Sequence, residues 1–130
     1  MRYLLDTCAI VWIAADPEKL SRSTSAAVSD PDAEVLVSAV SAAEIACACE
    51  RGRLELDRHW KTWFRFVVTE NGWEVLDVSL RIIEEAWSLP DEFHADPADR
   101  VMVATARTMD LVVITGDQRI LQYPHVESLC

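Results

Sequence analysis

The chain has 130 residues, 51% of them hydrophobic and only three of them glycine, which is the composition of one compact globular domain over residues 1–130. Its 22 acidic side chains outnumber the 12 basic ones and give a net charge of −10, which argues against tight binding to a bare nucleic-acid duplex. A few arginines and a bound divalent cation can still neutralise a phosphate locally. The charge therefore leaves a nucleic-acid substrate open, and it also suits a basic protein partner.

The sequence has no feature of a membrane or secreted protein. No apolar stretch approaches the roughly 20 residues that a membrane span requires, and the N-terminus lacks the basic region and cleavage site of a signal peptide. The cysteines include no C-x-x-C pair and the histidines are dispersed, which fits reduced thiols better than a zinc site. We therefore expect a cytoplasmic protein without a membrane partner.

Short hydrophobic runs alternate with segments of helical periodicity along the chain. Strands are predicted at residues 2–6, 34–38, 73–78 and 111–115, with an edge strand near His125 and Val126. In the first half of the chain, helices are predicted through Ile10 and Ile13, from Asp16-Pro17 to Asp30, and from Ser41 to Gly52. In the second half, one helix around Phe64 ends at Asn71-Gly72, and another through Ile82 and Trp87 is broken at Pro90. The last predicted helix covers residues 97–109. Strands separated by helices imply a parallel sheet with helices on both faces.

Four carboxylates lie where these hydrophobic runs stop. Asp6 and Asp117 each follow a predicted strand. Glu44 follows the second strand by one short turn, and Asp99 opens the last long helix. In parallel α/β sheets, ligands bind beyond the carboxyl ends of the strands, near a switch in strand order. A cluster of hard oxygen ligands with no lysine nearby is what a magnesium or manganese site needs.

Each acid taken alone also fits a structural role at the start of a helix. Glu44 is the third residue after Ser41, which is the spacing of a capping box, and Asp96 before Pro97 is a good N-cap. The same alternative applies to three further acids: Asp6, Asp99 and Asp117. A helix N-terminus offsets part of the repulsion between crowded carboxylates, so one acid can serve both roles. The occurrence of these acids together favours the metal site.

Four short segments occur in the order and spacing of a known family. They are Asp6-Thr7, Ser41-Ala42-Ala43-Glu44, His94-Ala95-Asp96-Pro97-Ala98-Asp99-Arg100 and Thr115-Gly116-Asp117. Over nearly its whole length the chain resembles the PIN-domain ribonucleases and, among them, the VapC-type toxins of bacterial toxin–antitoxin pairs. The resemblance implies a three-layer α/β/α sandwich with a central, mainly parallel sheet. It also implies magnesium- or manganese-dependent endoribonuclease activity and neutralisation by a cognate antitoxin.

The resemblance assigns roles to individual residues. The family's acidic quartet, catalytic and metal-holding, falls on Asp6, Glu44, Asp99 and Asp117, with Asp96 as a fifth, outer carboxylate. One or two cations held there would polarise the RNA phosphate and lower the pKa of a bound water. Glu44 would bind the second cation, orient the attacking water or act as a general base.

Three further side chains are candidates for substrate binding, and each has a structural alternative. The hydroxyls of Thr7 and Thr115 could position water or phosphate, although threonine beside a strand end often bonds only to backbone. Arg100 could contact phosphate or form a surface pair with a neighbouring acid. His94 could help at the mouth of the site, but a loop histidine without a role is the simpler interpretation.

The first predicted helix is the candidate docking surface. Ile10, Trp12 and Ile13 give it an apolar face, which if exposed could form a homodimer or a groove for the antitoxin. We expect the antitoxin to place an arginine in the acidic cleft, because a planar guanidinium can pair with two carboxylate oxygens. No base-reading motif identifies the RNA target.

Two other classes of protein, an enzyme and a signalling domain, do not fit. A haloacid-dehalogenase-like phosphatase needs a second acid at the position of Cys8 and a catalytic lysine, and a phosphate-receiver domain needs the same lysine. The only lysines, Lys19 and Lys61, lie away from the predicted strand ends. The remaining alternative is a PIN-like, non-catalytic binding module that acts through a protein partner, and the presence of all four acids argues against it.

Overall fold

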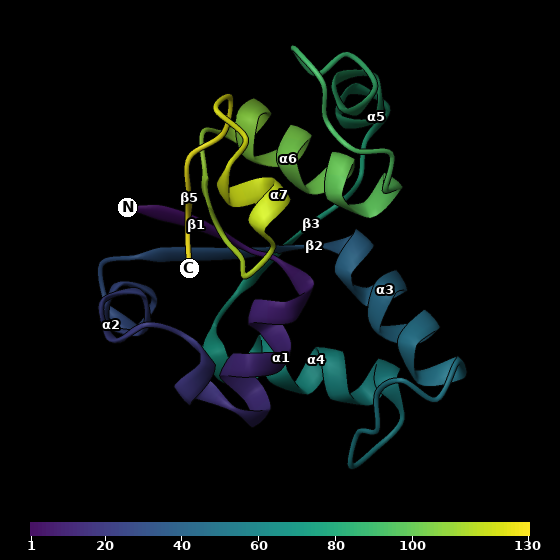
Figure 1. The fold of residues 1–130 in the computed structure, drawn as a ribbon. Helices are drawn as coiled ribbons and strands as arrows, with labels where there is room; N and C mark the ends of the chain where they lie inside the picture. Colours follow the sequence, from purple (N-terminus) through teal and green to yellow (C-terminus); the bar gives the residue numbers. More distant parts are fainter.

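Five strands form one central sheet in the computed structural model, which describes all of residues 1–130 (Figure 1). The strands run in the order β3-β2-β1-β4-β5, and every neighbouring pair is parallel. Their bounds are β1 Arg2–Leu5, β2 Glu34–Ser38, β3 Glu74–Leu76, β4 Val112–Ile114 and β5 Ser128–Leu129. The four predicted strands are confirmed, and the edge strand at the tail lies just beyond the predicted His125 and Val126.

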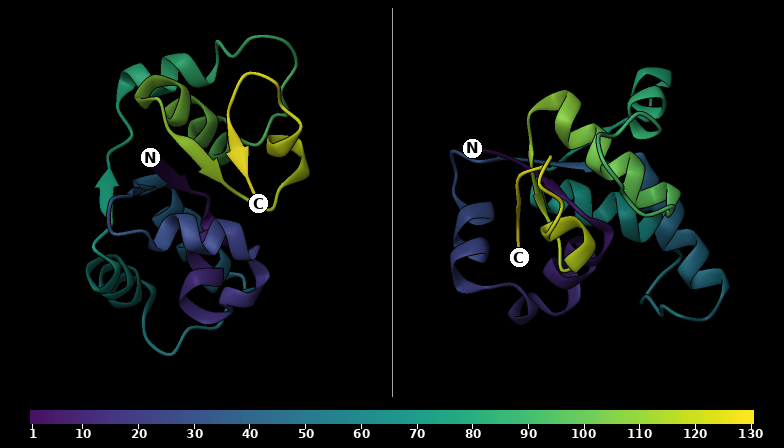
Figure 2. Two further views of the ribbon diagram at one scale, coloured as in Figure 1. Left: turned by 90° about the vertical axis from the view of Figure 1, so that its left-hand side faces the viewer. Right: turned by 45° about the horizontal axis from the view of Figure 1, so that its top comes forward.

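Helices cover both faces of this sheet (Figures 1 and 2). The α-helices are α1 Thr7–Ala15, α2 Arg22–Ser29, α3 Ala39–Glu50, α4 Trp60–Asn71, α5 Leu80–Ala86, α6 Pro97–Met109 and α7 Gln118–Leu121. Helices α1 and α4 pack on one face and α6 and α7 on the other, while α5 packs on the outside of α6. The expected three-layer α/β/α sandwich is confirmed. None of its helices has the length and apolarity needed to cross a membrane.

Strand β1 shows why a continuous hydrophobic run belongs at the centre of this sheet. Tyr3 and Leu5 face the side of α1 and α4, in the same buried cluster as Phe64. Leu4 faces the other side, in a second cluster that contains Met102 of α6. Because β1 lies between β2 and β4 with helices above and below, its successive side chains are buried on both faces.

The start of α3 differs from the prediction. The capping box expected at Ser41 is wrong, because the helix begins one turn earlier, at Ala39. Ser38 is the N-cap, and its hydroxyl accepts the N–H of Val40 at 3.1 Å. Glu44 consequently lies in the second turn of α3, and its side chain is free of any capping role.

The helix predicted from Asp16-Pro17 is also shorter than expected. Pro17 opens only one turn of 3₁₀ helix, Pro17–Lys19. Helix α2 begins after Ser21, whose hydroxyl accepts the N–H of Thr24 at 3.2 Å. The sequence therefore contains a second N-cap in this stretch, and the later one starts the α-helix.

Helix α1 does not present the open apolar face that the sequence suggested. Ile10 is completely buried and Ile13 is half-buried. The ring of Trp12 packs so closely over Gly116 that a Cβ at this position would lie 2.3 Å from it, which explains the glycine. Exposed apolar side chains occur instead at Leu80 and Ile83 of α5 and at Trp87, its C-cap.

Candidate active site

The predicted acids meet at the carboxyl ends of β1 and β4, the two strands between which the strand order reverses. From β1 the chain moves to β2 and β3 on one side and returns to β4 and β5 on the other. Asp6 follows β1, and its N–H donates to the carbonyl of Ile114 in β4 at 2.9 Å. Asp117 follows β4 at the start of α7. Such a switch point is where parallel α/β sheets bind ligands.

Asp6 is buried and oriented by three donors. It is the N-cap of α1, so Oδ1 accepts the N–H of Thr7 at 2.8 Å. Oδ2 accepts the hydroxyl of Thr115 at 2.6 Å, and the thiol of Cys8 lies 3.7 Å away from it. Burial, followed by the charge of Asp6, raises the pKa of Cys8 to about 11. The thiol therefore stays protonated and donates to the carboxylate.

Glu44 reaches the same site from α3. Its carboxylate accepts the hydroxyl of Thr7, which also lies 2.9 Å from the hydroxyl of Ser41. Burial is the largest cause that raises the pKa of Glu44, and the hydrogen bond from Thr7 lowers it. Three neighbouring carboxylates raise it further: Asp6, Asp99 and Asp96. Acids from separate motifs therefore influence one another across a single site.

Asp99 enters from the first turn of α6. Asp96 is the N-cap of this helix, and its Oδ1 accepts the N–H of Ala98 at 3.0 Å and that of Asp99 at 3.3 Å. Oδ2 of Asp99 lies 2.6 Å from Nε2 of His94 and 3.5 Å from Nη2 of Arg119. Burial raises the pKa of Asp99, the hydrogen bond from His94 lowers it, and the neighbouring acids raise it. Asp96 thus fixes the turn that directs Asp99 inward, as its predicted capping role requires.

Asp117 is the N-cap of the short helix α7. Its Oδ1 accepts the N–H of Arg119 at 2.8 Å, and the guanidinium of Arg119 pairs with both carboxylate oxygens, at 3.2 and 3.0 Å. This pairing holds the pKa of Asp117 below its usual range, against a smaller effect of burial. The N–H of Asp117 donates to the hydroxyl of Thr115 at 3.0 Å. Thr115 thereby links Asp117 to Asp6.

The chemistry of this donor set fits a hard divalent cation. Single ligand atoms of His94, Asp99 and Asp117 lie within 4.8 Å of one another, and the charge of Asp6 acts on both Glu44 and Asp99. Mg²⁺ and Mn²⁺ prefer carboxylate oxygens, and such an ion would relieve the repulsion among buried acids. An imidazole suits softer metals, so His94 is better placed to orient Asp99 by a hydrogen bond.

The chain is similar to known proteins over nearly its whole length. A family model described as the PIN domain matches residues 3–126. The chain belongs to the PIN-domain family. It is also 30% identical over 122 residues to ribonuclease VapC22 of Mycobacterium tuberculosis, a match that covers 94% of this chain and 92% of that protein. The resemblance to VapC-type PIN domains that the four motifs indicated is confirmed.

Solved structures share the fold of this PIN domain. The crystal structure of VapBC2 from Rickettsia felis bound to a DNA fragment from their promoter has a TM-score of 0.74 at 13% identity, and the match covers 98% of this chain and 97% of that chain. DNA-bound VapBC from Salmonella typhimurium gives a TM-score of 0.68 at 19% identity, covering 98% of this chain and 96% of that one. Both agree with the three-layer arrangement described above.

In this PIN domain the side chains predicted to bind substrate have protein partners. The hydroxyls of Thr7 and Thr115 both donate to carboxylates of the site, and Thr115 is completely buried. Arg100 donates to the carbonyls of Ala86 and Phe93, at 3.0 and 2.9 Å. These contacts suit the threonines to positioning acids and Arg100 to anchoring the loop before α6, and the contact of all three with substrate stays a prediction.

The sequence did not predict the contacts of two residues at the site of the PIN domain. His94, for which no role was the simpler interpretation, contacts Asp99. Arg119 pairs with Asp117 and Asp99. Its position two residues after a helix-capping aspartate was a usable signal, because a residue in the first turn can return its side chain to the cap. The position of His94 on an irregular loop offered no such spacing rule.

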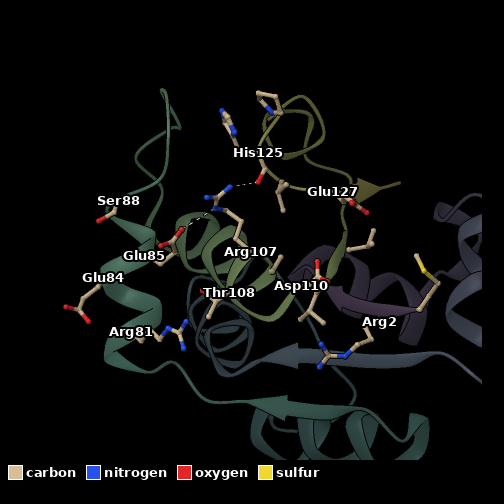
Figure 3. Close-up of a pocket in the computed structure, with 16 residues that line it drawn as sticks. Arg2, Arg81, Glu84, Glu85, Ser88, Arg107, Thr108, Asp110, His125 and Glu127 are labelled. Carbon is tan, nitrogen blue, oxygen red and sulfur yellow. Dashed lines mark hydrogen bonds and ion pairs between the residues drawn. The ribbon is translucent and has the colours of Figure 1, made fainter.

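A large cavity of this PIN domain lies at the opposite edge of the sheet (Figure 3). Its volume is about 1190 Å³, and it is lined by Arg2 at the start of β1 and by Arg81 and Arg107 from α5 and α6. Arg107 donates to Glu85 at 3.2 Å and to the carbonyl of His125 at 2.7 Å. The charge of Arg107 is thus matched by Glu85, and the three arginines of the cavity offset most of the charge of its four acids. Chemistry rather than cavity size identifies the candidate active site.

Proposed function

We propose that residues 1–130 are a single PIN domain that acts as a metal-dependent endoribonuclease toxin and is neutralised by a cognate antitoxin. The observation that supports this most is the meeting of four carboxylates at one edge of the sheet, at Asp6, Glu44, Asp99 and Asp117. Its relative VapC22 is named as a ribonuclease. The reaction would be hydrolysis of an RNA phosphodiester, in which water attacks phosphorus and one P–O bond breaks.

The carboxylates of Asp6, Asp99 and Asp117 would hold Mg²⁺ or Mn²⁺, with Glu44 and Asp96 at its border. When bound, the ion supplies Lewis-acid stabilisation of the phosphate and lowers the pKa of water. Glu44 is suited to accept a proton from the attacking water, because burial has already raised its pKa above the ordinary value of a glutamate.

The test is cleavage of labelled RNA by the purified chain in Mg²⁺, in Mn²⁺ and in EDTA. The wild type should cleave only with metal, and Asp6→Asn should lose activity by about 100-fold or more, since it removes the charge of a predicted ligand. Asp57→Asn is the matched control, because Asp57 is an exposed aspartate paired only with its neighbour Arg58. Equal cleavage by Asp6→Asn and wild type would contradict the assignment. Intact RNA with every metal would favour the non-catalytic binding module.

The antitoxin is the second part of the proposal. A net charge of −10 and an acidic cleft suit a basic arm of a partner protein. The pairing of Arg119 with Asp117 and Asp99 supports an inhibitory arginine, since a guanidinium already fits between these acids. Expression of the chain alone should arrest growth, co-expression of the neighbouring gene should rescue it, and Asp99→Asn should abolish the arrest. A harmless wild type that leaves cellular RNA intact would overturn the toxin assignment.

Homodimer formation and cytoplasmic action remain predictions. Helix α1 offers a dimer only a reduced apolar surface, because Ile10 is buried and Trp12 packs on Gly116. Sedimentation of the purified chain at micromolar concentration tests this, and a single species of monomer mass would contradict it.

A further inference from the structure

Arg119 places a positive charge beside the carboxylates of Asp117 and Asp99. Its Nε and Nη2 pair with Oδ1 and Oδ2 of Asp117 at 3.2 and 3.0 Å, and Nη2 also lies 3.5 Å from Oδ2 of Asp99. No other arginine or lysine forms an ion pair with the four acids of the site. A planar guanidinium that pairs with both oxygens of one carboxylate and borders a second one has a specific geometry that a flexible ammonium does not reproduce.

The same oxygens are the ones that a divalent cation would use. The ligand atoms that approach one another within 4.8 Å belong to His94, Asp99 and Asp117. Arg119 engages both oxygens of Asp117 and lies beside the oxygen of Asp99 that also contacts His94. A metal ion bound between Asp117 and Asp99 would carry two positive charges into the space next to this guanidinium. The two cations therefore compete for one position.

We propose that Arg119 is an internal cation that holds Asp117 and Asp99 in the metal-free protein and is displaced when the metal ion binds. The inference rests on the proposed metal-dependent function and adds a residue that sets the affinity of the site. In the metal-free state the guanidinium offsets the repulsion between the two acids and keeps their side chains close together. The same contact makes metal binding weaker than it would be in a site of carboxylates alone.

The structure leaves room for this displacement. The side chain of Arg119 is 58% exposed, so it can move without opening the core. It also lines a groove of about 680 Å³ beside the site, and His94 and Tyr123 are among the other residues that line this groove. Glu92 also lines the groove and offers an acidic partner to a guanidinium that has left Asp117, whereas Asp91 is already paired with His125 at 2.6 Å.

Calorimetric titration with Mg²⁺ and with Mn²⁺ separates displacement from a general effect of charge. Arg119→Lys keeps the charge and loses the planar fork, so it should bind metal roughly two- to fivefold more tightly than wild type, and Arg119→Gln more tightly still. Arg81→Gln is the matched control, because it removes an equal charge from the cavity at the opposite edge of the sheet (Figure 3). It should leave the dissociation constant unchanged.

A spectroscopic measurement follows the side chain itself. In EDTA the Nε–H resonance of Arg119, assigned by its loss in Arg119→Lys, should show the slow solvent exchange of a hydrogen-bonded group. Saturating Mg²⁺ should shift this resonance and speed its exchange. Asp117→Asn should give the freely exchanging signal without metal, because the paired carboxylate is gone.

The outcomes distinguish this inference from the proposed function. Metal binding by wild type with an unchanged Nε–H resonance, or with equal dissociation constants for wild type and Arg119→Lys, would overturn the displacement and leave the metal-dependent function standing. Failure of wild type and both Arg119 variants to bind Mg²⁺ or Mn²⁺ would overturn both.

Discussion

The two ends of strands β1 and β4 handle charge in opposite ways. At the amino ends, which we call the paired edge, basic and acidic side chains are mixed and exposed to water: Arg107 and Glu85 form a pair 3.2 Å apart, and their side chains are 30% and 35% exposed. At the carboxyl ends, acids are in excess and partly withdrawn from water. Asp6 and Asp99 are only 6% and 7% exposed, and Arg119 is the one arginine that serves the cluster.

This difference in charge distinguishes the candidate active site from the larger cavity at the amino ends. Exposed pairs contribute little to stability and can be exchanged at little cost. Buried acids that repel one another lower stability, and a protein that keeps them has a binding or catalytic use for them. The cavity of about 1190 Å³ at the amino ends would draw attention by its size, yet the acids at the opposite edge carry the chemistry.

The largest expected effect is that Asp99→Asn separates activity from stability. RNA cleavage should fall by about 100-fold or more, because the site loses the charge of a ligand. In EDTA the same variant should melt at a higher temperature, because one buried charge among like charges is gone. Cleavage kinetics and thermal unfolding measure the two effects.

Glu85→Gln at the paired edge is the control for Asp99→Asn. It should keep activity within about twofold of wild type and change stability by less than about 1 kcal/mol. A loss of both activity and stability in Asp99→Asn would mean that this acid is structural, and the contrast between the two edges would fail.

A buried threonine, Thr115, and a half-buried one, Thr108, sharpen the comparison. Thr115→Val keeps the shape but loses the hydroxyl that donates to Asp6, so activity should fall by about 10- to 100-fold. The free energy of unfolding should fall by about 1–3 kcal/mol, because the N–H of Asp117 also loses its acceptor. Thr108→Val, in the cavity at the other edge, should change either quantity only slightly (Figure 3). Equal effects of the two substitutions on cleavage would contradict a positioning role for Thr115.

The parts of this site that follow strands could be predicted from the sequence. A strand buried on both faces is a continuous hydrophobic run, and the polar residue that ends it must lie at the edge of the sheet. Asp6 and Asp117 were placed correctly for this reason. Asp96 and Asp99 were also placed correctly, because a capping aspartate before Pro97 fixes the start of α6 within one residue.

The remaining parts depend on distances that no local pattern encodes. Ser38 and Ser41 are both suitable caps for α3, and the choice between them decides whether Glu44 binds the helix start or faces Thr7. His94 lies on a loop without periodicity. The order of the strands, which sets β1 beside β4, comes from packing of the helices on both faces and not from the period of any one strand.

Metal binding should raise the free energy of unfolding through the acids at the carboxyl ends of the strands, and substitutions at the paired edge should not alter this effect. A ligand that binds only the folded state at a hundred times its dissociation constant adds about 2.7 kcal/mol to the free energy of unfolding. Thermal melts in Mg²⁺ or Mn²⁺ should therefore lie above those in EDTA. Asp117→Asn should shrink the difference, while Glu127→Gln, which lines the opposite cavity, should retain it. Identical melts in all conditions would contradict a metal site.

The smallest effect is a pH dependence of stability that arises at the acidic edge alone. Burial chiefly raises the folded pKa of Glu44 and of Asp99. Between the ordinary pKa of each group and its raised folded pKa, the folded protein holds more protons than the unfolded chain, so stability falls as the pH rises through that interval. Asp117 acts in the other direction: its pKa is lowered by Arg119, so its contribution is present above the ordinary value and is lost as the pH falls through the lower, folded value.

Glu44→Gln isolates the first of these contributions, because glutamine can still accept the hydroxyl of Thr7 but does not titrate. In EDTA, the free energy of unfolding of Glu44→Gln relative to wild type should increase as the pH rises above the ordinary pKa of a glutamate, because wild type alone must ionise a buried glutamate. Denaturant titrations at a series of pH values measure the difference. Saturating Mg²⁺ should reduce the slope for Glu44, since a bound cation favours the charged carboxylate. If the difference between Glu44→Gln and wild type does not vary with pH, Glu44 has the same pKa in the folded and the unfolded chain. That outcome would contradict the effect of burial on Glu44.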